Sequence, residues 1–181
     1  MPTLIQSQIV IPSGLLEIRP EGRRAVTLED APEVFPETRD PHGHSSDPVE
    51  TAYHVFEVLR SQCGLQRSHE HLFLLLYFDR IVEKLSSGAT LRAALLPLPK
   101  ARFSMCGDEH RPVSVDFAFW TGRRFVTVFI CESRFNEDSA EERFLRVWGC
   151  EVFRLMADQL ETRGLVGESG SKILDALWLR H

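Results

Sequence analysis

The chain has 181 residues, of which 43% are hydrophobic and 26% are charged, and its formal net charge is -5. This length suits one compact domain with its own core, and no apolar stretch approaches the about 20 residues that a membrane-spanning helix needs. The negative charge excludes a surface that holds duplex DNA by overall attraction, so a nucleic-acid contact would need a local basic patch or a partner. Four cysteines without a C-x-x-C pair and a first segment unlike a secretory signal predict a cytoplasmic protein with reduced thiols.

The first quarter of the sequence offers few signals of regular structure. Residues 1 to about 30 alternate apolar and polar side chains weakly, and turn signals at 12–14 and 20–22 divide them, which predicts short strands or an extended arm. From Asp30 to Asp47 the composition shifts to Pro, Glu, His, Gly and Ser, which indicates a linker with little to bury. We therefore expect an N-terminal arm and linker over 1–46, docking on a protein partner, and an α/β domain over 47–181.

Two helices are expected next. The segment Asp47-Pro48-Val49-Glu50 combines a capping acceptor, a first-turn proline and a carboxylate, and predicts a helix that runs to about Gln62. A second helix is expected from near Ser68 to Leu85, and its run 72–78 is apolar on nearly every side, which indicates burial by several neighbours. Residues 90–98 fit either a short helix or a strand.

The second half alternates strand and helix patterns. Strands are expected over 102–106, 112–120 and 124–131, the last two joined as a hairpin. In the 112–120 strand, Phe117 and Phe119 share one face and Asp116 and Ala118 the other. A capping box at 139–142 predicts a helix to Trp148, followed by a strand over 150–155 and a last helix over about 170–179. This order predicts a mixed central sheet flanked by helices.

Four of these stretches carry a family resemblance: VDFAFW at 115–120, GRR at 122–124, FVTVFIC at 125–131 and the segment 142–154. Together, and more loosely over 47–180, they resemble the PD-(D/E)XK superfamily of restriction-endonuclease-like proteins, in particular the branch of the very-short-patch-repair endonucleases. The resemblance implies a restriction-endonuclease-like fold with a Mg²⁺ site on the hairpin.

The resemblance also implies which residues would form that site. Asp116 stands where the first metal-binding aspartate belongs, while the positions of the family's glutamate and lysine fall on Phe129 and Cys131. A phenylalanine cannot coordinate a hard cation, so we expect no metal and no hydrolysis. The expected function is that of a catalytically degenerate nuclease-fold protein, a nucleic-acid-binding or accessory subunit in a prokaryotic defence or DNA-processing complex.

An alternative remains open at this point. An active Mg²⁺-dependent DNA endonuclease would use Asp116, Glu132 and Arg134 as catalytic residues, because 132–134 keeps the family's pattern of a glutamate two residues before a basic side chain. Glu132 has the opposite strand parity to Cys131, so a bulge would be needed to turn it inward. Metal ligands would then be Asp116, Glu132 and Glu50, with Glu57 as another helix carboxylate.

Two further groups of residues are candidates for binding. Arg123, Arg124, Arg143 and Arg154, with Arg134 and Arg146, would make a local basic patch for nucleic acid, although Arg143 and Arg146 also fit the exposed face of an amphipathic helix. Zinc would require a set drawn from Cys63, His69, His71, Cys106 and His110, whose spacings match no compact zinc motif. We expect Phe144 and Trp148 to be core residues.

Overall fold

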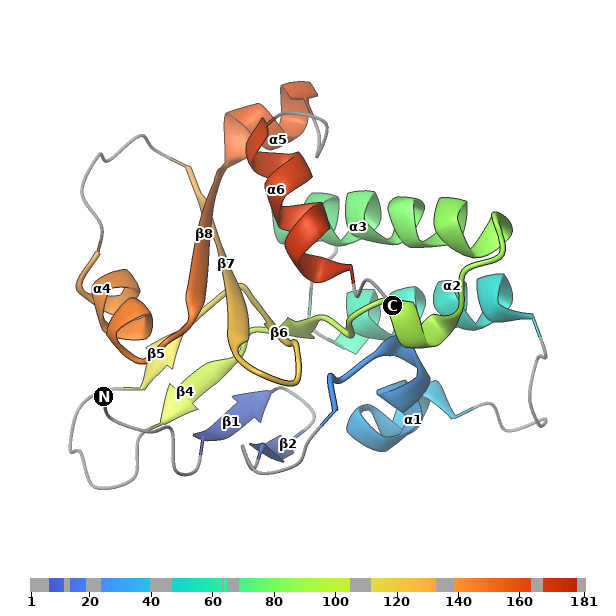
Figure 1. Ribbon diagram of the computed structural model, residues 1–181, viewed down its shortest axis with the longest axis horizontal. Coiled ribbons are helices and arrows are strands. Elements are labelled where there is room, and N and C mark those ends of the chain that lie inside the picture. The colour runs from blue at the N-terminus through green and yellow to red at the C-terminus, as the bar shows by residue number, and fades with distance from the viewer. Residues whose placement is uncertain are drawn as a thin grey trace.

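The computed structural model describes residues 7–11, 14–18, 24–39, 47–62, 64, 69–104, 112–132, 139–163 and 168–178. These residues form a mixed α/β fold with two four-stranded sheets (Figure 1). The first sheet has the order β2-β1-β4-β5, and all of its pairings are antiparallel. Its strands are β1 (Ser7–Ile11), β2 (Gly14–Ile18), β4 (Arg102–Ser104) and β5 (Val113–Ser114).

The second sheet has the order β3-β6-β7-β8 and contains the expected hairpin. Its strands are β3 (Leu98–Pro99), β6 (Phe117–Trp120), β7 (Phe125–Cys131) and β8 (Glu151–Met156). β6 and β7 pair antiparallel with Trp120 opposite Phe125, and Gly122 in the turn has a φ of 86°, a conformation that favours glycine. β8 runs parallel to β7, and the crossover between them contains α4 (Ala140–Val147). The hairpin prediction is therefore confirmed.

The expected strand over 112–120 is divided between the two sheets. β5 pairs with β4 in the first sheet, whereas β6 pairs with β3 and β7 in the second. Val115 and Asp116 form the connection, and Asp116 lies in a bend. A single alternating strand was thus the wrong prediction, because sequence alternation cannot show that a strand changes partners along its length. Asp116 consequently lies between the sheets.

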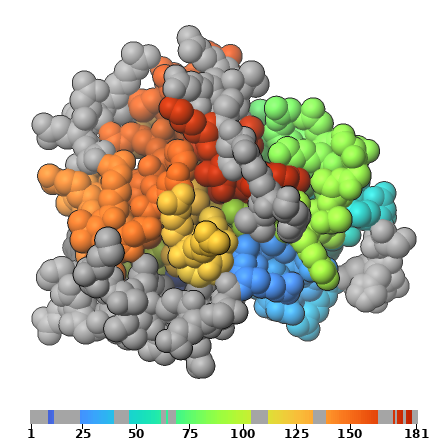
Figure 2. Space-filling model, viewed as in Figure 1, coloured from blue at the N-terminus to red at the C-terminus, as the bar shows by residue number. Residues whose placement is uncertain are grey.

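The long helices agree with the sequence pattern more closely than the divided strand does. They are α2 (Pro48–Gln62), α3 (His69–Ser86) and α6 (Glu168–Leu177), and a short helix α5 (Ala157–Arg163) follows β8 directly. The ambiguous segment 90–98 contains a 3-10 turn, η3 (Leu91–Ala93), and then β3. The space-filling view shows the segment from α4 to α5 on one side of the molecule, α3 on the other, and α6 between them (Figure 2).

The core lies between α3 and the second sheet. Phe73 packs against Phe117 with ring centroids 4.8 Å apart, and Tyr77 packs against Phe119 at 5.4 Å. The Tyr77 hydroxyl donates to the carbonyl of Leu95 at 2.7 Å, so the polar end of this buried ring is satisfied. In the apolar run of α3, Phe73, Leu74, Tyr77 and Phe78 are thus buried, whereas Leu72 and Leu76 are partly buried and Leu75 is 38% exposed. The prediction of burial on nearly every side is therefore wrong at Leu75.

The segment expected to be a linker is instead part of this core. Residues 28–38 form a 3-10 turn, η1 (Leu28–Asp30), a short helix, α1 (Ala31–Val34), and a second 3-10 turn, η2 (Pro36–Thr38). Leu28, Ala31 and Phe35 are fully buried. Their spacing places them on one face of a helical segment, a pattern that Pro32 and the acidic residues between them hid.

Backbone pairing also ties this segment to the rest of the fold. The Val26 amide donates to the carbonyl of Trp120 at 3.1 Å, and the Leu96 amide donates to the carbonyl of Val26 at 2.9 Å. In the first sheet, β1 lies between β2 and β4, with Ile9 opposite Phe103. The expected arm and linker over 1–46 is therefore corrected for 24–39 and for β1, which belong to the same core as residues beyond 47.

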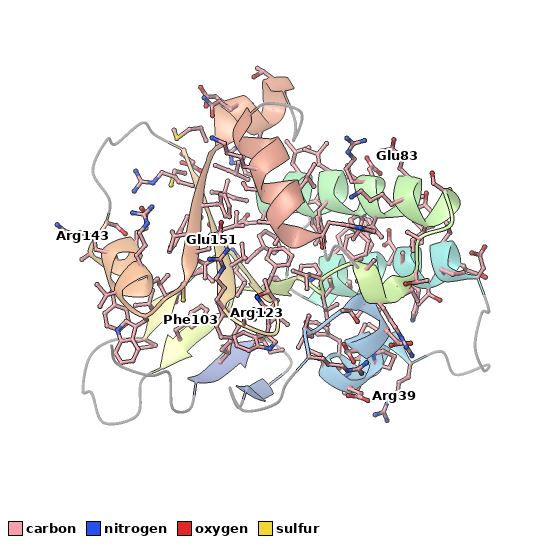
Figure 3. All side chains as sticks on the ribbon, viewed as in Figure 1. Arg39, Glu83, Phe103, Arg123, Arg143 and Glu151 are labelled. Atoms are coloured by element: carbon pink, nitrogen blue, oxygen red, sulfur yellow. The ribbon has the colours of Figure 1, made fainter. Side chains whose placement is uncertain are left out.

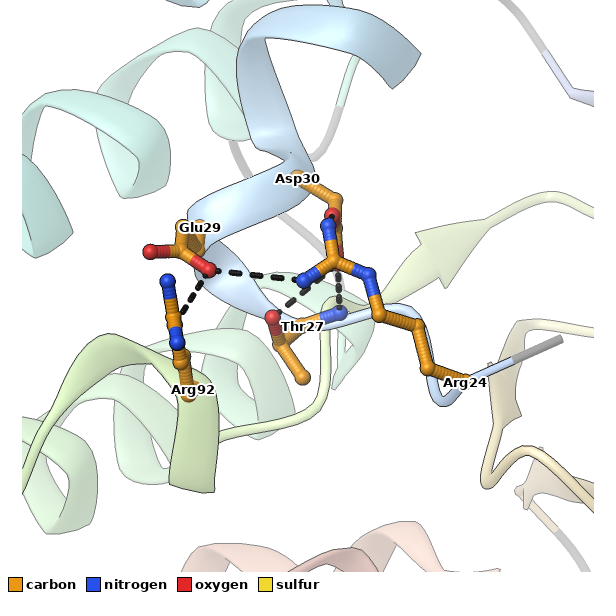
Figure 4. Close-up of polar contacts among 5 residues, drawn as sticks. All are labelled: Arg24, Thr27, Glu29, Asp30 and Arg92. Carbon is orange, nitrogen blue, oxygen red and sulfur yellow. Dashed lines mark hydrogen bonds and ion pairs between the residues drawn. The ribbon is translucent and has the colours of Figure 1, made fainter.

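A polar network holds the segment at its first turn (Figure 4). Asp30 Oδ2 accepts hydrogen bonds from the Thr27 amide at 2.8 Å and the Thr27 hydroxyl at 3.0 Å, and Oδ1 accepts from Arg24 at 2.5 Å. Glu29 pairs with Arg92 of η3 at 2.7 Å and with Arg24 at 3.6 Å. Arg92 holds the pKa of Glu29 below its usual value, mainly through this hydrogen bond. The network joins two segments far apart in sequence.

Candidate functional site

The carboxylate of Asp116 accepts a hydrogen bond from within the protein. Its Oδ2 accepts a hydrogen bond from the backbone amide of Ile130 at 2.7 Å. Antiparallel pairing between β6 and β7 ends at Phe117 and Val128, so Ile130 lies two residues beyond the last paired position. The side chain thus supplies an acceptor where the neighbouring strand no longer offers a backbone carbonyl. Burying that amide without a partner would be costly.

The other oxygen of Asp116 faces a lysine that the sequence motifs did not single out. Lys100 follows β3, and its Nζ lies 4.0 Å from Asp116 Oδ1 and 2.5 Å from Glu70 Oε1 in the first turn of α3. The Lys100 amide also donates to the Asp116 carbonyl at 2.8 Å. Lys100 has a φ of 53°, a left-handed conformation that costs roughly 1–2 kcal/mol for a residue with a Cβ atom. Backbone and side chain therefore both connect Lys100 to Asp116.

The electrostatic surroundings of Asp116 are mixed. Burial raises the pKa of its carboxyl, and the negative charge of Glu70 acts in the same direction. The Ile130 amide and the Lys100 ammonium lower this pKa, but the net direction is upward. The side chain is 25% exposed, so the group is neither fully buried nor freely hydrated. Asp116 is therefore less readily ionised than an ordinary aspartate.

The positions expected to hold the family's other two site residues offer no hard ligand. Phe129 and Cys131 lie on β7 and are half-buried. Burial raises the pKa of the Cys131 thiol, the nearby charges of Glu142 and Asp116 act in the same direction, and Arg154 opposes them. The thiol is consequently protonated at neutral pH, a form that is a poor nucleophile and a poor metal ligand.

The carboxylates of the alternative metal site do not come together with Asp116. Glu132 is exposed in a bend after β7, and Glu50 is exposed in the first turn of α2. Glu57 is exposed and pairs with Arg60 at 2.5 Å. Within the described ranges, no group of three or more His, Cys, Asp or Glu side chains is placed to hold a metal ion. Arg134 lies outside the described residues.

The zinc candidates that the structure describes also contact other side chains. His69 Nε2 pairs with Glu161 Oε1 of α5 at 3.0 Å, and the His71 ring packs near Phe56 with centroids 6.0 Å apart. Cys63, Cys106 and His110 lie outside the described residues. The two remaining cysteines, Cys131 and Cys150, are both free thiols.

Two of the four arginines expected to contact nucleic acid form internal ion pairs. Arg154 donates from Nε and Nη2 to Glu142 Oε1 at 2.9 and 2.6 Å, and Glu142 is only 2% exposed. Arg124 pairs with Glu151 on β8 at 2.6 Å. Arg123 and Arg143 are exposed, and Figure 3 shows them well apart, at the hairpin turn and on α4. These four residues therefore do not make one continuous patch.

Three residues of this region escaped the sequence analysis: Glu70, Lys100 and Glu142. Glu142 was expected only as the acidic member of a capping box. Its amide does donate to the hydroxyl of Ser139 at 3.2 Å, but its side chain turns to Arg154 instead. The sequence contains one signal for this ion pair, because the acidic Glu142 and the basic Arg154 stand at opposite ends of the segment 142–154. No local signal marks Glu70 and Lys100, because their contact joins residues 30 positions apart.

Comparisons with protein families, with curated proteins and with solved structures found no match for this chain. Among the helices that the structure describes, none has both the length and the apolar character needed to cross a bilayer.

Proposed function

We propose that this chain is a catalytically degenerate nuclease-fold protein that acts as an accessory subunit, in a cytoplasmic complex that processes DNA or defends against foreign DNA. The order of elements after Asp116 supports the proposal: a hairpin, a helix and a parallel strand follow one another as the resemblance implies. The fold alone does not determine function, and the side chains around Asp116 are the more informative feature.

The observation that carries the proposal is the set of contacts made by the Asp116 carboxylate. One carboxylate oxygen accepts the Ile130 amide, and the other faces the Lys100 ammonium. Mg²⁺ needs near-ideal octahedral oxygen coordination and is held by one or two carboxylates together with water. Phe129 and the protonated thiol of Cys131 supply no such oxygen on the neighbouring strand. The arrangement supports a structural role for Asp116 and argues against hydrolysis.

The distribution of charge favours a protein partner over nucleic acid. Arg124 and Arg154 neutralise acidic side chains of the chain itself, and the formal net charge is -5. On α4, by contrast, Val147 is 71% exposed and lies beside the half-buried pair Phe144 and Trp148, whose ring centroids are 5.7 Å apart. An exposed apolar residue flanked by aromatic rings is typical of surfaces that proteins bind.

Plasmid cleavage with Mg²⁺ or Mn²⁺ tests the proposal directly. We expect the wild-type protein to cleave no faster than the Asp116→Ala variant, because neither would hold a catalytic metal. Fluorescence anisotropy with a labelled duplex should show weak binding, with a Kd of about 10⁻⁴ M or weaker near physiological salt.

Cleavage that depends on Asp116 would overturn the proposal and favour the active endonuclease, for which Glu132→Ala should then also abolish activity. Tight binding with a steep dependence on salt, reduced in Arg123→Ala and Arg143→Ala, would contradict the preference for a protein partner. It would instead favour the nucleic-acid-binding form of the degenerate protein.

A further inference from the structure

The outer edge of β8 differs from the other sheet edges that the structure describes. The strand order places β7 on one side of β8 and no described strand on the other. β8 has six residues in unbroken parallel register, without a proline or a lysine. The edge strands β3 and β5 have two residues each, and β2 has five and begins with Gly14. Proteins commonly protect an edge by making it short or by placing proline or lysine there, and β8 has none of these features.

The two charged side chains of β8 are already paired within the chain. Glu151 pairs with Arg124 beside the hairpin turn, and Arg154 pairs with Glu142 of α4. The other half-buried side chains of the strand are apolar: Val152, Phe153 and Met156. A neutral, largely apolar segment of this length, rich in strand-forming residues, pairs readily with a further strand.

Helices lie on both sides of β8. Figure 1 shows α4 on one side of the strand and α6 on the other, and both helices contact it. A further strand would therefore be added in the plane of the sheet, where an edge strand presents its backbone amide and carbonyl groups.

The sequence of β8 suits pairing with a second copy of itself. A two-fold axis perpendicular to the sheet pairs two identical edge strands antiparallel and places each residue opposite one on the same face. Centring the pairing on Phe153 places the two phenylalanines opposite each other. Val152 then stands opposite Arg154, and Glu151 opposite Leu155, so no like charges face one another.

The neighbouring registers are less favourable. Centring the pairing on Arg154 would place two arginines opposite each other, and like charges in this position are destabilising. Centring it on Val152 would pair only residues 151–153 of the six-residue strand. Charge and length therefore favour the register centred on Phe153.

We infer that two copies of this chain associate through their β8 strands, antiparallel and centred on Phe153. The two second sheets then form one continuous sheet, in the order β3-β6-β7-β8 followed by the same strands of the other copy in reverse. The inference does not depend on the proposed accessory function, because backbone pairing requires neither a metal site nor a DNA-processing complex.

The mass of the wild-type protein in solution tests the association. The interface is short, so we expect a Kd on the order of 10 µM and a mostly dimeric protein at about 100 µM. Sedimentation equilibrium at that concentration should give a mass that approaches twice the monomer mass of 20.7 kDa. A protein that remains monomeric there would overturn the proposal.

Cysteine cross-linking tests the register. In the dimer the two residues at position 153 lie opposite each other, with Cβ atoms about 5 Å apart, whereas the two residues at position 151 are about 13 Å apart along the strands. Oxidation with copper phenanthroline should therefore link Phe153→Cys into a dimer that reduction reverses. Glu151→Cys is the matched control and should show no more linkage than the wild type, which has four cysteines of its own. Equal linkage in both variants would contradict the register.

Hydrogen exchange of the wild type tests the same strand if Phe153→Cys does not fold. The outward-facing amides of β8 should exchange about fourfold more slowly at about 100 µM than at about 1 µM, because most chains are dimeric only at the higher concentration. Mass spectrometry of peptides that cover β8 measures this difference. Peptides that cover β2, an edge strand outside the pairing, should exchange equally at both concentrations. Exchange in β8 that is independent of concentration would overturn the proposal, whatever the result of plasmid cleavage.

Discussion

Two aspartates of this protein, Asp30 and Asp116, perform the same local task in different surroundings. Asp30 closes the first turn of η1 by accepting the Thr27 amide and hydroxyl, and Asp116 closes the end of the β6–β7 pairing by accepting the Ile130 amide. Only Asp116 was expected to belong to a metal site. The comparison shows that an aspartate with such a sequence context can serve the backbone as an ordinary capping residue does.

The two carboxylates differ in how completely they are satisfied. Asp30 is 10% exposed, and both of its oxygens have hydrogen-bond donors within 3.0 Å. Asp116 is 25% exposed, and among the described residues the ion-pair partner of its Oδ1 is the Lys100 ammonium at 4.0 Å. Burial raises the pKa of Asp116, with a further contribution from Glu70. The surroundings of Asp116 therefore oppose its ionisation.

The largest effect is expected at Asp30. Asp30→Ala should lower the free energy of unfolding by about 2–3 kcal/mol, because it leaves the buried amide and hydroxyl of Thr27 without their acceptor. The exposed Arg24 adds little to this figure, since its ion pair is screened by water. Urea denaturation followed by circular dichroism measures the change. A loss below that of Asp116→Ala would reverse the ranking of the two residues.

A smaller loss in the free energy of unfolding is expected at Asp116, and its size should depend on which residue replaces the aspartate. Asp116→Ala should cost about 1–2 kcal/mol by removing the acceptor of one backbone amide. Asp116→Asn keeps a carbonyl oxygen for that amide and removes a poorly supported charge, so its stability should match or exceed that of the wild type at neutral pH. The same urea experiment applies, and equal losses in both variants would contradict the capping role.

The smallest expected effect is a dependence of the protein's stability on pH. Because the pKa of Asp116 is raised above its ordinary value of 3.8, the folded state binds the proton more tightly than the unfolded state. The resulting stability is fully present below that value and is lost as pH rises through the folded pKa. The stability of the wild type relative to Asp116→Asn should therefore fall as pH rises from below 3.8 toward neutrality. Urea midpoints of both proteins along a pH series measure this difference, and a constant or rising difference would disprove the shift.

The local parts of the fold were predictable because their signals are local. The hairpin is specified by two apolar strands around a turn with Gly122, and α2 by the capping residue, proline and carboxylate at its start. The burial of segment 24–38 was missed because its buried apolar residues are separated by a proline and acidic residues, a composition that favours a linker. The composition of a segment is an average over all of its residues, whereas burial depends on which few side chains share one face of the helical segment.

The sequence by itself determined the α/β class, the long helices and the hairpin, and it singled out Asp116 as a candidate site residue. Only the tertiary structure decided what Asp116 does. The division of the 112–120 segment between two sheets frees the Ile130 amide for the carboxylate, and the packing of α3 brings Glu70 and Lys100 together. These contacts join residues far apart in sequence, and their geometry is set by packing across the whole core rather than by any local pattern.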